Sequence, residues 1–325
     1  MTHLTYLEAA VVGVIQGVSE MFPVSSLGHA VLIPALIGGP WAHDLNVAAP
    51  GSSYLAFIVA LHVATAVALL VYFRRDWIRI IGAFFSSVAR RRVETPDQKL
   101  AWMIILATIP VGLAGAAFQQ GFQAFFGHPG YAAIFLAVNG LILLAGERFR
   151  RRSSVAADEV ADRQREDAEL VAVGRHSAGA RAGRQREQAA DTTSDRRLAR
   201  LGYLEATLIG SAQILALLAG ISRDGVAMVA GMLNGLSRQD AARFAFLLAT
   251  PVILAAGLLK VPDLLGSGSH GSRGPILLGS VLAGVSAYLS VRFLLRYLRT
   301  RTLTPFGIYC LVAGLASLLY LGLGG

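Results

Sequence analysis

Six apolar runs, each close to twenty residues long, constrain the fold of this chain more than any other feature. They cover roughly residues 54–73, 100–118, 131–149, 241–260, 275–295 and 304–322. A helix of about 20 apolar residues spans the hydrocarbon core of a bilayer. The chain is 54% hydrophobic and 15% charged, which lies outside the range of ordinary soluble domains. The sequence therefore predicts an all-α integral membrane protein with six transmembrane helices.

Positive charge indicates how these spans are oriented. Of 29 Lys and Arg residues, seven lie within 74–99, thirteen within 148–200 and four within 292–301. All three clusters flank apolar runs, as cytoplasmic loops do under the positive-inside rule. We therefore interpret the net charge of +9 as an orientation signal, and we expect no nucleic-acid partner.

Two further apolar stretches, 6–36 and 203–238, are interrupted near their middles. The interruptions fall at Pro23–Gly28 and at Gly220–Gly225. Proline removes a backbone donor and glycine lets the chain turn. The orientation of the six spans makes each stretch begin and end on one side of the membrane, so we interpret both as re-entrant pairs of broken helices. A kinked full span is the alternative.

An internal repeat supports the re-entrant interpretation. A shift of 197 positions aligns Tyr6-Leu7-Glu8-Ala9 with Tyr203-Leu204-Glu205-Ala206, and Gln16, Ser25 and Gly28 with Gln213, Ser222 and Gly225. Each half then holds an odd number of spans, which predicts an inverted-topology repeat. The expected organisation is an N-terminal repeat over 1–149, a disordered cytoplasmic linker over 150–202 and a C-terminal repeat over 203–325, with both repeats in one membrane domain.

Ionisable and hydroxyl side chains are concentrated at the first interruption. Residues 20–29 include Glu20, Ser25, Ser26 and His29 in an otherwise apolar stretch, and ionisable groups at membrane depth usually mark a functional site. Gln16 lies one helical turn before Glu20 on the same helix face.

The second interruption supplies Arg223, the basic residue that we expect at membrane depth. We expect the two interruptions to meet. Helix starts at Ser25–Ser26 and at Ser222 would offer free N–H groups to an anion, and the guanidinium group suits bidentate phosphate contacts. These features predict a phosphorylated ligand.

Several roles are open for these residues. Ser26 or Ser25 could attack phosphorus while His29 transfers the proton. Glu20, with Gln16 on its face, could hold a divalent cation or orient the imidazole. The structural alternatives are helix caps for the serines, Ser222 included, and a buried ion pair between Glu20 and Arg223.

Three other ionisable residues receive structural interpretations. His62 is expected to be a packing or interhelical hydrogen-bonding residue. Glu8 and Glu205 are expected at helix starts, where a carboxylate suits the macrodipole.

Together these residues resemble a known family. The strings Gln16-x-x-x-Glu20, Pro23-Val24-Ser25-Ser26-x-Gly28-His29 and Gly220-x-Ser222-Arg223 are similar to motifs of the undecaprenyl-pyrophosphate phosphatases of the bacitracin-resistance type. The resemblance runs through both halves and leaves out the linker. It implies an enzyme of the bacterial plasma membrane that removes the terminal phosphate of a C55 isoprenoid pyrophosphate and so recycles the carrier lipid of cell-wall synthesis.

The resemblance also implies site residues and a cofactor. The family's site opens toward the outer face and needs a divalent cation, Mg²⁺ or Ca²⁺. Carried over by position, the cation ligands are Glu20 and Gln16. The catalytic residues are Ser26, His29, Glu20 and Arg223, and the substrate-binding residues are Ser25, Gly28, Ser222, Arg223 and Asp224.

The chain departs from the family pattern at Leu27, Ala219, Asp224 and Ala227, where the family commonly has a small hydroxyl residue, proline, serine and threonine. Asp224 is the sharpest departure, because an acid beside Arg223 could neutralise the phosphate clamp or help to hold the cation.

Two other functions stay open at this point. One is a polyprenyl-phosphate transporter or flippase, because inverted repeats with broken helices are typical of transporters. The other is a weakly active paralogue acting on other lipid pyrophosphates. A carrier needs the anion site but no nucleophile. The expected partners are a polyprenyl pyrophosphate and membrane lipids, with a homodimer as an open alternative.

Overall fold

The described part of the chain is helical. The computed structural model describes residues 4–47, 53–152, 194–195, 197–265 and 273–323. In chain order the elements are α1 (Tyr6–Met21), α2 (Ser26–Ile37), α3 (Gly39–Asp44), α4 (Ser53–Tyr72), α5 (Arg74–Arg90), α6 (Pro96–Phe126), α7 (Pro129–Arg152), α10 (Tyr203–Ala212), the 3-10 helix η1 (Gln213–Leu217), α11 (Arg223–Leu233), α12 (Arg238–Leu265), α13 (Arg273–Tyr297) and α14 (Thr304–Gly322). These ranges contain no strand, which confirms the all-α prediction.

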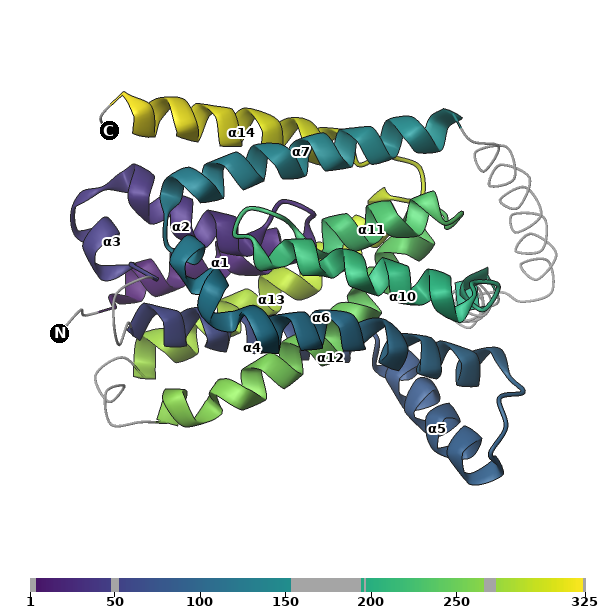
Figure 1. Ribbon diagram of the computed structural model, residues 1–325. Coiled ribbons are helices and arrows are strands. Elements are labelled where there is room, and N and C mark those ends of the chain that lie inside the picture. Colours follow the sequence, from purple (N-terminus) through teal and green to yellow (C-terminus); the bar gives the residue numbers. More distant parts are fainter. Residues whose placement is uncertain (1–3, 48–52, 153–193, 196, 266–272, 324–325) are drawn as a thin grey trace, which may run out of the picture.

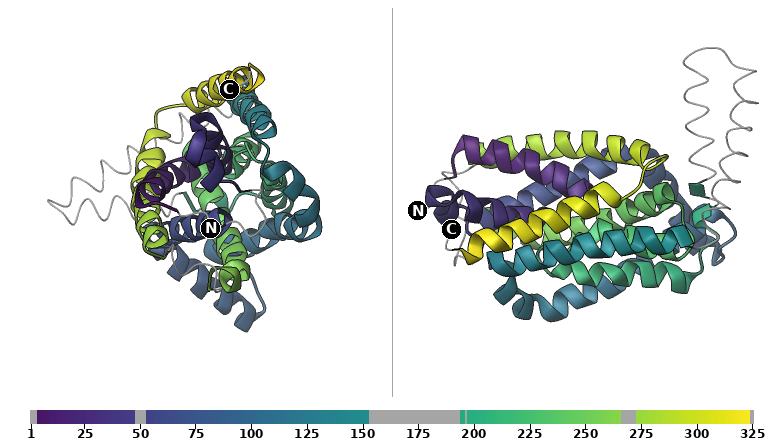
Figure 2. Two further views of the ribbon diagram at one scale, coloured as in Figure 1. Left: turned by 90° about the vertical axis from the view of Figure 1, so that its left-hand side faces the viewer. Right: turned by 90° about the horizontal axis from the view of Figure 1, so that it is seen from above.

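Six of the described helices are long and apolar enough to cross a membrane. They are α4, α6, α7, α12, α13 and α14, with candidate spans Tyr54–Tyr72, Pro96–Ala117, Pro129–Arg151, Arg238–Leu258, Arg273–Tyr297 and Thr304–Gly322. Each coincides with one predicted run, shifted by a few residues at its ends. The long helices share one general direction, and α7 lies beside α14 (Figures 1 and 2).

Both interrupted stretches fold as pairs of short helices. The first helix, α1, ends at Met21, and α2 begins at Ser26 after the turn that contains Pro23. In the second stretch, α10 tightens into η1 before Gly220, and α11 starts at Arg223. In Figure 1, α1 and α2 lie toward the end of the bundle that carries both chain termini, and α10 and α11 lie toward the other end. The interruptions are confirmed, while the re-entrant placement and the inverted repeat stay predictions.

Carboxylates begin both of these stretches, as expected. Glu8 accepts a hydrogen bond from the backbone N–H of Thr5 over 2.8 Å, and Thr5 in turn caps α1 through its hydroxyl. Glu205 accepts one from the N–H of Gly202 over 2.8 Å. Each satisfies a donor that the helix start leaves free, so both residues have the structural role predicted for them.

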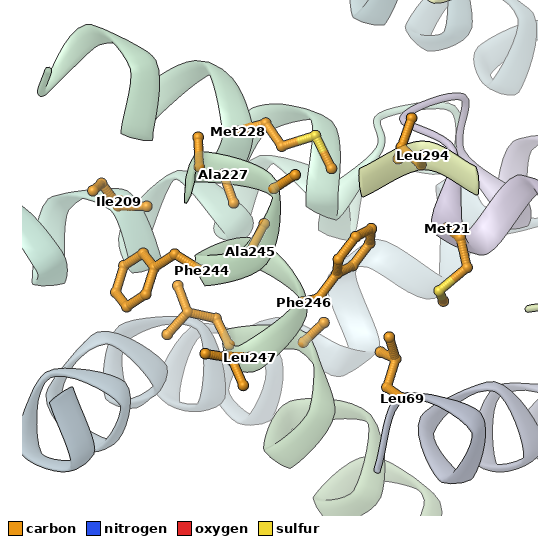
Figure 3. Packing of buried hydrophobic residues seen from close by; sticks show 14 of the residues in the cluster. Met21, Leu69, Ile209, Ala227, Met228, Phe244, Ala245, Phe246, Leu247 and Leu294 are labelled. Carbon is orange, nitrogen blue, oxygen red and sulfur yellow. The ribbon is translucent and has the colours of Figure 1, made fainter. Parts of the chain in front are cut away.

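The most buried span is α12, which forms the centre of the bundle. Of its most apolar window 67% is buried, against 22% for α14. Phe244, Phe246 and Leu247 of α12 are fully buried, and Figure 3 shows them among Met21 of α1 and Met228 of α11. The same central helix therefore packs against residues that flank both interruptions.

Two features of the basic segments were not predicted. The first basic cluster forms the helix α5, where the sequence analysis expected a loop. Near the end of the predicted linker, Leu198 and Leu201 are buried, and Asp195 pairs with Arg243 of α12 over 2.7 Å. Residues 153–193 of that linker lie outside the described residues, so its disorder stays a prediction.

Candidate active site

The two helix interruptions touch at the middle of the bundle. A Cβ atom placed on Gly28 would lie 3.0 Å from the Cα of Gly220, and one placed on Gly225 would lie 3.3 Å from the Cβ of Pro23. Gly220 also has a φ of +110°, a left-handed conformation that glycine adopts without strain. The prediction that the segments meet is confirmed, and glycine is what allows the close approach.

A buried amide from a third helix joins the two interruptions. Asn139 of α7 donates from Nδ2 to the carbonyl of Pro23 over 3.0 Å. Its Oδ1 accepts from the backbone N–H of Ser222, also over 3.0 Å. This residue was missed in the sequence analysis, although an amide inside an apolar span is a signal that could have drawn attention to it.

Helix caps use two of the three serines. The hydroxyl of Ser25 accepts from the N–H of Gly28 over 3.2 Å, and that of Ser222 accepts from the N–H of Gly225 over 3.1 Å. Ser25 has a φ of 68°, a strained conformation for a residue with a Cβ. Ser26 is the first residue of α2 and its hydroxyl is not used as a cap.

Glu20 is the centre of the polar cluster. Its Oε1 accepts a short hydrogen bond from Nη2 of Arg223. Its Oε2 accepts from the hydroxyl of Ser26 and from Nε2 of Gln16 over 3.1 Å. The buried ion pair between Glu20 and Arg223, which the sequence analysis gave as the structural alternative, is present. The same carboxylate also binds the hydroxyl of Ser26, which could act as a nucleophile. Stability alone does not require that arrangement.

The imidazole of His62 contacts the same carboxylate. Nε2 of His62, on α4, lies 3.3 Å from Oε2 of Glu20. Nδ1 of His62 lies 2.8 Å from the carbonyl of Ile58, and a carbonyl only accepts, so Nδ1 carries a proton. The sequence interpretation of an interhelical hydrogen-bonding residue fits, but it did not foresee that the partner would be Glu20.

Both ring nitrogens of His29 form hydrogen bonds. Its Nδ1 lies 2.8 Å from the carbonyl of Ser25 and must donate to it. Its Nε2 lies 2.7 Å from the hydroxyl of Tyr309, and the two rings are parallel to within 6°. The imidazole in contact with Glu20 is therefore His62 and not His29. Tyr309 gave no signal in the sequence, because an aromatic residue near the middle of an apolar span is ordinary.

Three polar residues of this site line one small pocket. Gln16, Ser26 and His29 line it together with Tyr54 and with apolar side chains, namely Val12, Ile15, Ala30, Ile33 and Pro34. The pocket therefore places reactive side chains beside apolar ones that suit a hydrocarbon.

Asp224 has no strong partner despite its burial. It is only 2% exposed, and neither carboxylate oxygen makes a hydrogen bond with the described residues. Its nearest ionic partner is Nε of Arg223, 3.8 Å from Oδ1. The Arg223 guanidinium thus lies between two carboxylates, those of Glu20 and Asp224.

The donor set for a metal ion is incomplete in the protein alone. The described residues contain no group of three or more His, Cys, Asp and Glu side chains arranged to hold one. Mg²⁺ is commonly held by one or two carboxylates together with substrate phosphates. The buried carboxylate of Asp224, which makes no hydrogen bond with the described residues, fits a cation that arrives with a pyrophosphate.

This arrangement is suited to chemistry on a phosphate ester or anhydride. A serine hydroxyl donates to a carboxylate that can take its proton, which is the usual way to activate such a nucleophile. A guanidinium and the free N–H groups of two helix starts can stabilise negative charge on phosphate oxygens.

Comparison with known proteins gives the family. A model of the bacitracin resistance protein BacA matches residues 9–316. The chain is 57% identical over 321 residues, 99% of each chain, to the undecaprenyl-diphosphatase of Mycolicibacterium paratuberculosis. It is 54% identical over 339 aligned positions, 97% of each chain, to undecaprenyl-diphosphatase 2 of Frankia alni. A more distant relative is undecaprenyl-diphosphatase 2 of Chromobacterium violaceum, at 39% over 319 residues that cover 97% of this chain and 98% of that one. Because the match extends from the first interrupted helix to the last span, this chain belongs to the BacA family of bacitracin resistance proteins.

Proposed function

We propose that this chain is a multi-pass enzyme of the bacterial inner membrane that hydrolyses undecaprenyl pyrophosphate to undecaprenyl phosphate and inorganic phosphate. Relatives that match almost its full length carry the name undecaprenyl-diphosphatase, and six apolar helices suit a lipid substrate. The observation that carries the proposal is the shared carboxylate of Glu20, which accepts from both Ser26 and Arg223.

Substrate binding begins with an exchange of partners at Arg223. Without a ligand its guanidinium pairs with Glu20. A pyrophosphate carries more charge than one carboxylate and offers oxygens for bidentate contacts. It therefore draws Arg223 onto the phosphate and leaves Oε1 of Glu20 free. The N–H groups of Ser26 and Leu27 at the start of α2, and of Arg223 and Asp224 at the start of α11, are not used by the caps and bind the remaining phosphate oxygens.

The first chemical step transfers the terminal phosphoryl group to Ser26. Its Oγ attacks the terminal phosphorus, and its proton passes to Oε2 of Glu20, to which it already donates. The bond from phosphorus to the bridging oxygen breaks, and undecaprenyl phosphate leaves with that oxygen. Arg223 stabilises the charge on the oxygens of the transferred group.

The second step returns the enzyme to its starting state. Water attacks the phosphorus of phosphorylated Ser26 and gives a proton to Nε2 of His29, whose Nδ1 proton is fixed by the carbonyl of Ser25. The bond between phosphorus and Oγ breaks, Glu20 returns its proton to Oγ, His29 gives the proton it took from water to the inorganic phosphate, and the phosphate leaves. The hydroxyl of Tyr309, which donates to Nε2 of His29 in the resting enzyme, gives up that nitrogen while water transfers its proton.

A divalent cation, Mg²⁺ or Ca²⁺, would be held by Asp224 and Glu20, with the amide oxygen of Gln16 as a further ligand. When bound it would neutralise charge on the pyrophosphate. Asp224 is included because its buried carboxylate has no hydrogen-bond partner in the described structure. Asp224, which departs from the family pattern, is thus assigned the role of a cation ligand.

The apolar side of the pocket suits the first isoprene units of the lipid. Val12, Ile15 and Ile33 line it beside Ser26 and His29, so a hydrocarbon chain next to the reacting phosphate would be covered without placing a polar group against lipid. A homodimer stays the open alternative that the sequence left, and light scattering of the detergent-solubilised protein tests it.

Release of inorganic phosphate tests the proposal. Purified protein supplied with undecaprenyl pyrophosphate and Mg²⁺ should release phosphate, and Ser26→Ala, His29→Ala and Arg223→Ala should each lower the rate at least about a hundredfold. Ser25→Ala is the matched control, because it removes a cap, costs about 1 kcal/mol of stability, and leaves the reacting hydroxyl in place. Protein that binds the lipid but releases no phosphate would instead support the carrier alternative.

A further inference from the structure

The helix α5 turns an apolar stripe away from the protein. Ile78 is 74% exposed, Ile81 49%, Phe85 64% and Val88 49%. Their spacing of three, four and three residues places all four on one helix face. Figures 1 and 2 show α5 diverging from the bundle at the end opposite the chain termini.

The opposite face of α5 packs against the bundle through apolar and polar contacts, which hold the helix in this orientation. Ile80 is 3% exposed and lies in the hydrophobic core, and Phe84 packs against it. Asp76 accepts a hydrogen bond from Arg243 of α12 over 2.8 Å. At the other end, the hydroxyl of Ser87 accepts from the indole N–H of Trp102 on α6 over 3.0 Å. A soluble helix would direct its apolar side inward. Here a second apolar side, with Ile80, already faces inward together with these polar contacts, so the exposed stripe cannot turn toward the core without breaking them.

Arginines are placed at both ends of the stripe. Arg74 and Arg75 precede it, and Arg90, Arg91 and Arg92 follow it, and all five are exposed. A helix of 17 residues is about 25 Å long, so the two basic groups lie at opposite ends of one apolar surface. This combination is typical of helices that lie in the interface of an anionic membrane.

We propose that α5 is an interfacial helix that binds anionic phospholipid of the cytoplasmic leaflet. The acyl chains lie along Ile78, Ile81, Phe85 and Val88. The headgroup phosphates bind the arginines, chiefly Arg90, Arg91 and Arg92 after the last turn. Charge complementarity selects an anionic lipid over a zwitterionic one, and the apolar stripe selects a lipid over a soluble anion. The binding surface is separate from the proposed active site and does not depend on the reaction.

Spin labels measure where the stripe lies. Cys310 is the one cysteine of the chain, so Cys310→Ala gives a background for Ile81→Cys and Phe85→Cys, with Glu94→Cys as an exposed control. In vesicles of phosphatidylcholine and phosphatidylglycerol, labels at 81 and 85 should be relaxed by oxygen and not by a water-soluble nickel complex, and the label at 94 should show the reverse. Access by nickel at 81 and 85, or by neither reagent, would overturn the proposal, because the stripe would face water or be covered by protein.

Lipid retention tests the charge preference. We expect wild-type protein in mixed nanodiscs to retain phosphatidylglycerol in preference to phosphatidylcholine. The variant Arg90→Gln/Arg91→Asn/Arg92→Gln should lower that retention at least about tenfold, since each basic residue near an anionic surface contributes about fivefold. Asparagine is chosen at 91 because Arg91 has a positive φ, which asparagine tolerates.

The control variant is Arg296→Gln/Arg299→Gln/Arg301→Gln, which removes three exposed arginines at the end of α13 and in the connection to α14. It should retain phosphatidylglycerol at the wild-type level. Equal losses in both variants, or no loss in the first, would contradict a specific site on α5 and leave only a general attraction to the basic end of the protein.

Discussion

Nε2 of His62 lies 3.3 Å from Oε2 of Glu20. The same oxygen accepts the hydrogen bond that the hydroxyl of Ser26 donates. The helix α4, outside the interrupted pair, therefore contributes to the polar centre. Because Nδ1 of His62 donates to the carbonyl of Ile58, a proton on Nε2 would make the ring cationic and its contact with Glu20 an ion pair.

The first prediction concerns this histidine. His62→Leu removes one donor from a buried carboxylate, and hydrogen bonds to charged groups contribute about 1.5–3 kcal/mol. We expect kcat to fall about tenfold to a hundredfold. His62→Gln can still donate to Glu20 and should stay within about fivefold of wild type. Thr65→Val, one turn further along α4, is the control for packing. Equal losses for His62→Leu and His62→Gln would show that Glu20 does not need this donor.

The second prediction separates stability from activity at the ion pair of Glu20 and Arg223. Arg223→Leu removes an ionic partner from two buried carboxylates, Glu20 and Asp224, which costs about 3–5 kcal/mol, and it should lower the rate at least about a hundredfold. In the double variant Glu20→Gln/Arg223→Leu the thermal midpoint should recover in part, because Asp224 still lacks its partner, while the activity stays low. Recovery of activity in the double variant would show that the pair is structural only.

The third prediction concerns the aspartate that departs from the family pattern. Asp224→Ser should keep most of the activity at saturating Mg²⁺, since Ser26, Glu20 and Arg223 remain in place. It should raise the Mg²⁺ concentration needed for half-maximal activity, and Mn²⁺ binding measured by electron paramagnetic resonance in the presence of pyrophosphate should weaken in parallel. A loss of a hundredfold or more at saturating cation would instead assign Asp224 a catalytic role of its own.

The fourth prediction tests how closely the second interruption packs against α7. A Cβ on Gly220 would lie 2.4 Å from the carbonyl oxygen of Ala132, and the residue has a φ of +110°, so Gly220→Ala should be destabilising by about 2 kcal/mol or more. Gly115→Ala places its Cβ in open space on α6 and should leave the thermal midpoint unchanged or slightly raised. Similar midpoints for both variants would contradict the close approach.

Much of this fold was predictable because the relevant signals are local. The length of an apolar run identifies a span, and Pro23 and Gly220 mark interruptions whatever surrounds them. The convergence on Glu20 was only partly predictable. Spacing along one helix places Gln16 beside it, but the contact of His62 depends on how α4 packs against α1, which no periodicity reports. Tyr309 was missed for the same reason, whereas Asn139 carried a local signal, an amide within an apolar span, that was not used.

The helix α5 was missed for a different reason. Its arginines made residues 74–92 resemble a basic loop, and the positive-inside rule supported that interpretation. The helical spacing of Ile78, Ile81, Phe85 and Val88 was present in the sequence and could have indicated an amphipathic helix. This segment carries both a cluster of positive charge and a helical spacing of apolar residues, and the sequence analysis considered only the charge.

Rapid quenching with undecaprenyl pyrophosphate labelled on its terminal phosphate tests the central claim most directly. The account predicts that acid quench during the first turnover captures label on the peptide that contains Ser26, that Ser25→Ala still shows it, and that Ser26→Ala loses both the label and phosphate release. Undiminished phosphate release by Ser26→Ala, or rapid release by wild type with no label on protein at any time, would contradict attack by the hydroxyl of Ser26.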